Sequence, residues 1–273
     1  MEMYAVLGEK LSHTLSPQIN QYLFKALKVD AVYGVLEVKR ADISKVIDAI
    51  KVLGYKGINV TIPYKELIMP SLDVISPEAL AIGAVNTIEI RDGRSYGYNS
   101  DYFGFARMLA HGQVSPTGKD VVIFGAGGAA KALIAYLHDS GAKSILVVSS
   151  VPKELEAIKE HFEYVLTALL TETDRFKGDI CINATPVGMF PQLIDESIVS
   201  EEVICRFKVA ADIVYNPLDT KFLKLAKKNG LTTLSGLYML IYQAVKSQEI
   251  FHQTSIDLSI GDIIFKDLSK LFR

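Results

Sequence analysis

The sequence has no tryptophan and only two cysteines, Cys181 and Cys205, in 273 residues. No Cys-x-x-Cys pair or Cys/His cluster surrounds either cysteine, so the sequence indicates neither a disulfide framework nor a zinc site. No apolar run approaches the roughly 20 residues that cross a bilayer, and Glu2 stands where a secretory signal carries bases. We therefore expect a soluble cytoplasmic protein without a membrane anchor.

The sequence also has no excess of positive charge, because it contains 29 Lys and Arg residues and 31 Asp and Glu residues, which gives a net charge of -2. A surface that binds nucleic acid needs a basic excess to neutralise phosphates, so nucleic acid is not an expected partner. Hydrophobic residues make up 49% of the chain. This content supports a globular core, and the length exceeds that of one average domain, so we expect two domains.

Segments with strand and helix patterns alternate along the first part of the chain. The apolar spacing predicts strands at residues 3–8, 33–38 and 57–61, and helices at residues 15–28, 43–53 and from Tyr64 onward. Pro17 and Pro63 stand where a first helical turn tolerates proline. Such alternation indicates parallel strands joined by crossover helices, in an α/β fold.

A second α/β region begins near Lys119. Its apolar runs predict strands at residues 120–124, 144–149, 179–184 and 209–214, with helices after the glycine-rich turn, from Ile194 and from Phe222. After Ser235 the pattern is helical, and we expect this segment to return to the first domain. We assign residues 1–102 and 235–273 to one α/β domain and residues 103–234 to a Rossmann-like dinucleotide-binding domain, joined by a short hinge.

The glycine-rich turn reads Gly125-Ala126-Gly127-Gly128-Ala129-Ala130, which matches G-x-G-x-x-G/A between a predicted strand and a predicted helix. Glycines allow a tight turn and let backbone N–H groups approach a pyrophosphate at the helix N-terminus. This context predicts dinucleotide binding at residues 125–129.

The end of the second strand of this region holds Ser149 and Ser150. NAD sites usually place an Asp or Glu there for the ribose 2′-hydroxyl, so the sequence suggests that no carboxylate is in place. Two hydroxyls and the nearby Lys153 could bind a 2′-phosphate, which favours NADP and does not exclude NAD. The alternative is that residues 149–153 only form the turn before a helix.

A series of further motifs follows in order along the chain. They are Ser12-His13-Thr14-Leu15-Ser16-Pro17, Asn59-Val60-Thr61-Ile62-Pro63-Tyr64-Lys65, Gly83-Ala84-Val85-Asn86-Thr87, Asn99-Ser100-Asp101-Tyr102-Phe103-Gly104, Asn183-Ala184-Thr185-Pro186-Val187-Gly188-Met189, Asp212-Ile213-Val214-Tyr215-Asn216-Pro217, and Gly236-Leu237-Tyr238-Met239-Leu240 with Gln243. In this order, and with the glycine-rich turn, they resemble the shikimate dehydrogenase family over residues 4–250.

The resemblance implies an N-terminal substrate domain with a mainly parallel sheet, a Rossmann-like NADP-binding domain, and a cleft between them. It also implies reversible, NADP-dependent reduction of the small molecule 3-dehydroshikimate to shikimate in aromatic amino acid biosynthesis, by a monomer or homodimer. Reducing a ketone by hydride leaves an alkoxide that must be protonated. By resemblance, Lys65 polarises the carbonyl and donates that proton, and Asp101 pairs with Lys65. The ultimate proton source stays open.

The remaining site residues are also implied by the resemblance. The substrate would be bound by Thr14, Ser16, Asn59, Thr61, Asn86, Tyr215 and Gln243, with Thr14, Ser16 and Tyr215 at the carboxylate. The cofactor would be bound by Gly125, Ala126, Gly127, Gly128, Ala129, Ser149, Ser150, Lys153, Thr185, Ile213, Gly236 and Met239. We leave His13 out of catalysis because such a histidine more often bonds the loop backbone.

Two positions depart from the family pattern. Thr14 replaces a common serine and adds a methyl group near the carboxylate, and Ser150 stands where an arginine commonly contacts the adenosine phosphate. Quinate or aminoshikimate dehydrogenase therefore remains an alternative of the same family. A non-catalytic ligand-sensing domain is a further alternative, against which the retained Lys65 and Asp101 argue.

Overall fold

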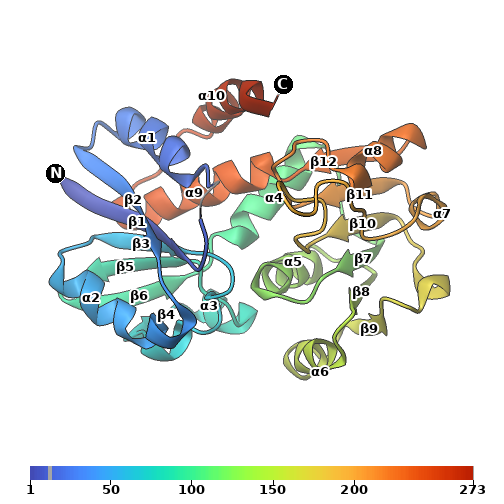
Figure 1. Cartoon of the computed structure of the whole chain (residues 1–273), viewed down its shortest axis with the longest axis horizontal. Helices are drawn as coiled ribbons and strands as arrows, with labels where there is room; N and C mark the ends of the chain where they lie inside the picture. Colours follow the sequence, from blue (N-terminus) through green and yellow to red (C-terminus); the bar gives the residue numbers. More distant parts are fainter. Residues whose placement is uncertain (12–13, 273) are drawn as a thin grey trace. The chain divides into compact units, whose positions relative to one another are not determined.

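The computed structural model describes residues 1–11 and 14–272. The chain divides into two compact units, of which unit 1 comprises Met1–Phe103 and Ile241–Lys266 and unit 2 comprises Gly104–Leu240 and Asp267–Arg273. The divisions fall within three helices, α4 (Asp101–His111), α9 (Leu237–His252) and α10 (Ser259–Leu268) (Figure 1). Within the described residues, α10 is followed by a 3-10 helix (Ser269–Phe272).

Unit 1 is built on one mixed sheet. Its elements are β1 (Glu2–Gly8), α1 (Ser16–Leu27), β2 (Ala31–Glu37), a 3-10 helix (Arg40–Lys45), α2 (Val46–Val52), β3 (Gly57–Val60), a 3-10 helix (Met69–Ser71), β4 (Val74–Ile75), α3 (Pro77–Ile82), β5 (Thr87–Arg91) and β6 (Arg94–Tyr98). The strand order is β2-β1-β3-β5-β6-β4. The pairs β1–β2, β1–β3 and β4–β6 are parallel, whereas β3–β5 and β5–β6 are antiparallel.

The β5–β6 hairpin was not predicted from the alternation of strands and helices. Its turn is Asp92-Gly93, with φ angles of 51° and 73°, and a two-residue hairpin turn of this kind strongly favours Asp-Gly. The predicted helix from Tyr64 was wrong, since this segment forms turns that lead into the 3-10 helix at Met69–Ser71. Pro70, which lacks an N–H group, leaves too few residues after Pro63 for a stable helix.

Alternation along β1 divides the core of unit 1 between the two faces of the sheet. Ala5 and Leu7 belong to a buried cluster that includes Val46, Ile47 and Ile50 of the α2 segment. Tyr4 points to the other face, where its ring lies 5.5 Å from that of Phe24 in α1 and 5.1 Å from that of Phe251 in α9. The period of two along a strand therefore explains why helices cover both faces.

Unit 2 contains a parallel sheet. Its elements are β7 (Asp120–Phe124), α5 (Gly128–Asp139), β8 (Ser144–Ser149), α6 (Pro152–His161), β9 (Leu166–Leu169), a 3-10 helix (Thr173–Arg175), β10 (Ile180–Asn183), α7 (Glu201–Ile204), β11 (Val209–Asp212), α8 (Lys221–Lys228) and β12 (Thr232–Ser235). The strand order is β12-β11-β10-β7-β8-β9, with parallel pairing throughout. This is the Rossmann order, and it confirms the predicted fold class.

The connection between β10 and β11 differs from the prediction. The helix expected from Ile194 is absent among the described residues of this connection, which forms turns until α7 begins at Glu201. The Ser197 hydroxyl donates to the Val199 carbonyl at 2.8 Å, an example of a short polar side chain competing with helical hydrogen bonds. The two edge strands β9 and β12 were also not predicted.

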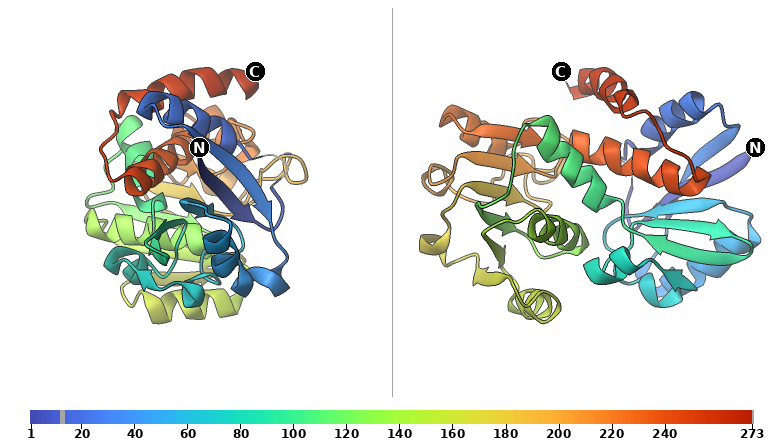
Figure 2. Two further views of the ribbon diagram at one scale, coloured as in Figure 1. Left: turned by 90° about the vertical axis from the view of Figure 1, so that its left-hand side faces the viewer. Right: turned by 180° about the vertical axis from the view of Figure 1, so that it is seen from behind.

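The paths of α4 and α9 along the chain can be followed in Figures 1 and 2. Within unit 2, the His111 ring of α4 stacks on the Tyr238 ring of α9, with centroids 3.6 Å apart. Across the described residues, no helix is both long enough and apolar enough to cross a membrane.

Candidate active site

The predicted polar residues of unit 1 gather at one edge of its sheet. Parallel strands β1 and β3 end there, antiparallel β5 begins there, and β6 ends there. Neighbouring strand ends therefore present the segments that carry Thr14, Thr61, Asn86 and Asp101. Ser12 and His13, which belong to the first of these segments, lie outside the described residues.

Lys65 and Asp101 form an ion pair and hydrogen bond between the Lys65 Nζ and an Asp101 carboxylate oxygen. The two side chains are only 12% and 6% exposed. Because water solvates neither side chain well at such low exposure, each ion depends on the other for electrostatic stabilisation. The geometry thus brings an ammonium donor and a carboxylate acceptor together at the sheet edge.

Asn99 fixes Asp101 in place at the start of α4. Its side-chain oxygen accepts hydrogen bonds from the backbone N–H groups of Asp101 at 3.0 Å and Tyr102 at 3.3 Å, which caps the helix. Its amide group donates to the Ala84 carbonyl at 2.9 Å. Because Val85 donates its N–H to the Lys65 carbonyl at 2.8 Å, both members of the pair are tied to residues 84–85.

A buried polar network lies beside this pair. The Asn59 amide donates to Ser247 at 2.8 Å and to Thr87 at 3.1 Å, and the Asn86 side-chain oxygen accepts from the Ser100 N–H at 2.7 Å. The Ser100 hydroxyl lies 3.1 Å from that of Ser247. These five side chains are at most 6% exposed, and their mutual hydrogen bonds satisfy groups that burial would otherwise penalise.

The network brings three predicted residues together and adds three that were missed. Ser100 donates to the Gln243 side-chain oxygen at 3.4 Å, which connects Gln243 with Asn59 and Asn86. Thr87, Ser100 and Ser247 were missed as site residues. The first two stood within quoted motifs and Ser247 follows Gln243 by one helical turn, so spacing at i and i+4 was the signal that could have found it.

The segment after β1 contributes two hydroxyls. The Thr14 hydroxyl donates to Ser16 at 3.1 Å and accepts from the Ser16 N–H at 3.3 Å, which shapes the entrance to α1. The Ser16 carbonyl accepts from Asn20 at 2.8 Å, and Asn20 accepts from Gln248 of α9 at 2.7 Å. The two predicted carboxylate ligands of unit 1 are therefore adjacent and braced from α9.

The glycine-rich turn of unit 2 fits a dinucleotide. Gly125 has φ of 113°, and a Cβ there would lie 2.8 Å from the Ala184 carbonyl oxygen. Gly127 has nothing within 4 Å of such a Cβ, so its backbone is open beside the first residues of α5. The turn follows β7 at the point where the strand order reverses, the usual position of a pyrophosphate.

Two neighbouring strand ends support this turn. The Thr185 hydroxyl donates to the Asn183 side-chain oxygen at 2.6 Å, and Asn183 donates to Asp212 at 3.0 Å. Asp212 also accepts from the Thr220 hydroxyl at 2.6 Å and from the Val214 N–H at 2.9 Å. The segments carrying Thr185 and Tyr215 are thus anchored on one buried carboxyl.

Burial raises the pKa of the Asp212 carboxyl to about 7, although its three hydrogen bonds act in the opposite direction. Unfolded, this carboxyl ionises near its ordinary pKa of 3.8, so between about pH 4 and about pH 7 the folded state binds more protons. The free energy of unfolding therefore falls as the pH rises through this window. We expect Asp212→Asn to remove that part of the pH dependence.

The measurement is urea unfolding of the parent and of Asp212→Asn at about pH 5 and about pH 8. The parent should lose more stability than the variant on going to the higher pH. A difference between the two proteins that stays constant with pH would contradict this assignment.

The end of β8 differs from the prediction, because a carboxylate is present there. The Ser149 hydroxyl donates to Glu154 Oε2 at 2.6 Å and accepts from the Val151 N–H at 3.1 Å. Glu154 lies in the first turn of α6, which folds it back onto the strand end. Ser149 therefore does shape the turn before the helix, and the expectation that no carboxylate is in place was wrong. Ser150 and Lys153 are both exposed.

The other predicted cofactor residues lie along unit 2. A Cβ on Gly236 would lie 2.2 Å from the Ile213 carbonyl oxygen, so these two backbones touch. Met239 is buried near the start of α9, with 6% exposure. Tyr215 is half-buried after β11 and belongs to unit 2, whereas Thr14 and Ser16 belong to unit 1.

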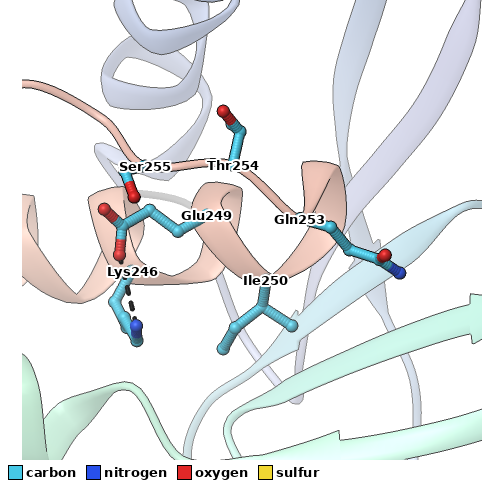
Figure 3. Close-up of a pocket in the computed structure, with 6 residues that line it drawn as sticks. All are labelled: Lys246, Glu249, Ile250, Gln253, Thr254 and Ser255. Carbon is cyan, nitrogen blue, oxygen red and sulfur yellow. Dashed lines mark hydrogen bonds and ion pairs between the residues drawn. The ribbon is translucent and has the colours of Figure 1, made fainter.

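A separate hollow lies at the C-terminal end of α9 and contains none of the predicted residues. It is lined by Lys246, Glu249, Ile250, Gln253, Thr254 and Ser255 (Figure 3). Lys246 and Glu249 form an ion pair at 3.2 Å across one side of it. The described residues contain no group of His, Cys, Asp or Glu that could hold a metal ion.

A Rossmann-type strand order, the glycine turn at its switch point and a paired lysine and aspartate together define a dinucleotide-dependent oxidoreductase. The model of the shikimate dehydrogenase substrate binding domain matches residues 6–88, and that of the coenzyme F420-dependent NADP oxidoreductases matches residues 120–204. A shikimate dehydrogenase (NADP(+)) of Clostridium perfringens is 46% identical, over 100% of both chains.

Solved structures of shikimate dehydrogenases are also similar to this chain. The crystal structure of shikimate dehydrogenase 1 from Peptoclostridium difficile has a TM-score of 0.94 and 45% identity, covering 100% of this chain and 99% of that one. The enzyme of Thermus thermophilus in complex with NADP(H) and shikimate has a TM-score of 0.87 and 29% identity, covering 98% and 99%. The chain belongs to the shikimate dehydrogenase family.

Proposed function

We propose that this protein is an NADP-dependent shikimate dehydrogenase, which reversibly reduces 3-dehydroshikimate to shikimate in aromatic amino acid biosynthesis. The observation that carries the proposal is the shielded Lys65–Asp101 pair at the polar sheet edge of a chain with full-length shikimate dehydrogenase relatives. NADP, when bound, supplies or accepts the hydride. The residues of this chain hold the substrate and manage the proton.

Lys65 has the chemistry that the carbonyl end of this reaction requires. Its ammonium donates a hydrogen bond to the carbonyl oxygen and stabilises the negative charge that grows there as the ketone is reduced. Lys65 then gives a proton to that oxygen. Asp101 keeps the lysine oriented and helps the Lys65 amine to regain a proton. In the oxidative direction the same pair accepts the proton of the hydroxyl.

Short polar side chains recognise the rest of the substrate. We assign the ring hydroxyls to Asn59, Thr61, Asn86 and Gln243, because amides and hydroxyls both donate and accept hydrogen bonds. The carboxylate is assigned to Thr14 and Ser16, with Tyr215 as the third contact. The adjacency of Thr14 and Ser16 and the shared network of Asn59, Asn86 and Gln243 support these assignments.

The two units have different roles. Unit 1 is the proposed substrate domain and unit 2 the proposed NADP-binding domain, with Thr185, Ile213, Gly236 and Met239 of unit 2 among the cofactor contacts. Cys181 and Cys205 are free thiols, which fits a cytoplasmic location. We propose a monomer or homodimer.

Quinate is the alternative substrate, because Thr14 departs from the family pattern at the assigned carboxylate contact. The test follows the absorbance of reduced nicotinamide with shikimate or quinate, each combined with NADP or NAD. We expect the highest kcat/KM for shikimate with NADP. Higher kcat/KM for quinate would replace this function by that of a quinate dehydrogenase, and no turnover of either acid would reject both.

Thr14→Ser tests the carboxylate assignment. The change removes one methyl group and keeps the hydroxyl, so we expect the KM for shikimate to change by the equivalent of ~1 kcal/mol while the KM for NADP stays constant. Steady-state kinetics with each reactant varied in turn measure both values. An effect confined to the KM for NADP would place Thr14 outside the substrate site.

A further inference from the structure

The cofactor region contains a charged group that the sequence pattern did not reveal. Glu154 Oε2 lies 2.6 Å from the Ser149 hydroxyl oxygen, at the last residue of β8. In Rossmann domains, the end of this second strand is where the adenosine ribose is recognised. A carboxylate at this point favours a free 2′-hydroxyl, because the hydroxyl can donate a hydrogen bond to it. It disfavours a 2′-phosphate, because the two negative charges repel each other.

Ser149 holds this carboxylate and is itself occupied. Its hydroxyl hydrogen goes to Glu154 and one of its lone pairs accepts the Val151 N–H at 3.1 Å. Ser149 is 8% exposed, so its hydroxyl has little room to turn elsewhere. A 2′-phosphate would therefore have Ser150 and Lys153 as its nearby side-chain donors, with the Glu154 charge opposing it.

We propose that Glu154 is a specificity-determining residue of the cofactor site. Its carboxylate, held by Ser149, weakens binding of the NADP 2′-phosphate and accepts a hydrogen bond from the 2′-hydroxyl of NAD. The inference rests on the proposed function, because it places the adenosine end of the cofactor at β8. It predicts that this chain prefers NADP over NAD by a narrower margin than an arginine at position 150 would give.

The decisive variant is Glu154→Gln, which removes the charge and keeps an oxygen that can accept from Ser149. Glu156→Gln is the matched control, because Glu156 lies on the same helix α6, is also exposed, and loses the same charge. Residues two apart on a helix face different directions, so only Glu154 points back to the strand end. Neither substitution touches Lys65 or Asp101.

Two probes isolate the 2′-position. Adenosine 2′,5′-bisphosphate and 5′-AMP differ by the 2′-phosphate alone, and calorimetry gives their Kd values on the full-length protein without turnover. We expect Glu154→Gln to bind the bisphosphate about tenfold more tightly and 5′-AMP no more tightly than the parent does, whereas Glu156→Gln leaves both Kd values at those of the parent. The ratio of kcat/KM for NADP over NAD should rise by a similar factor.

Other outcomes overturn the inference. An equal gain in both glutamine variants would assign the effect to net charge, and an unchanged bisphosphate Kd in Glu154→Gln would place the 2′-phosphate away from Glu154. A different outcome concerns the proposed function. If the Kd values change as expected but the protein has no activity on shikimate, the proposed substrate is rejected and the role of Glu154 is kept.

Discussion

Lys65→Ala and Asp101→Asn should each lower kcat for shikimate oxidation by about 10²-fold or more, the scale expected when an acid–base group is removed. The Kd for shikimate should change less, because the amide and hydroxyl contacts remain. Steady-state kinetics and calorimetry measure the two quantities separately. Near-parental kcat in both variants would show that this pair does not act on the reacting oxygen.

Stability must be separated from chemistry in this test. Removing one partner of a shielded ion pair leaves the other charge unpaired, which generally costs about 3–5 kcal/mol. Lys51→Ala provides the control, since Lys51 forms an ion pair with Asp73 at 2.7 Å in the same unit. We expect Lys51→Ala to keep the parental kcat, and thermal unfolding of all three variants shows whether each remains folded at the assay temperature.

Gly125→Ala should abolish measurable NADP binding, because the new Cβ would meet the Ala184 carbonyl and the backbone has a φ of 113°. Strain of this kind costs about 1–3 kcal/mol and displaces the turn, so we also expect a lower Tm. Gly127→Ala should instead keep the parental Tm, since its Cβ has nothing within 4 Å, and weaken NADP about tenfold by crowding the pyrophosphate.

Titration with NADP and thermal unfolding without cofactor distinguish the two glycines. The expected pattern is that Tm falls in one variant and cofactor affinity falls in both. Parental NADP affinity in Gly127→Ala would mean that the pyrophosphate does not approach this backbone.

Much of the fold could be predicted because its signals are local. The strand β8 matches residues 144–149, and α5 follows the glycine turn as its motif requires. The segment after Pro63 could not be read in this way, because a helical pattern of apolar residues also occurs in a series of turns whose side chains reach the core. Tyr64 and Ile68 are fully buried there without a helix.

The site was predictable where a motif carried it and not where tertiary packing made it. Lys65 and Asp101 are 36 residues apart in sequence, and the motifs of the family paired them in advance. Ser247 approaches Asn59 across 188 residues, a contact that only the packing of α9 on the sheet creates. The approach of Glu154 to Ser149 depends on the backbone path into α6, for which the sequence offered two interpretations.

The buried hydroxyls beside the Lys65–Asp101 pair have no fixed direction of donation. Either oxygen can be the donor between Thr87 and Ser247, and likewise between Ser100 and Ser247. Reversing such a chain requires only rotation of hydroxyl hydrogens, with every heavy atom left in place. A ketone can only accept at its oxygen, whereas the alcohol made from it also donates. One rigid arrangement of side chains can therefore suit both ends of a reversible reaction.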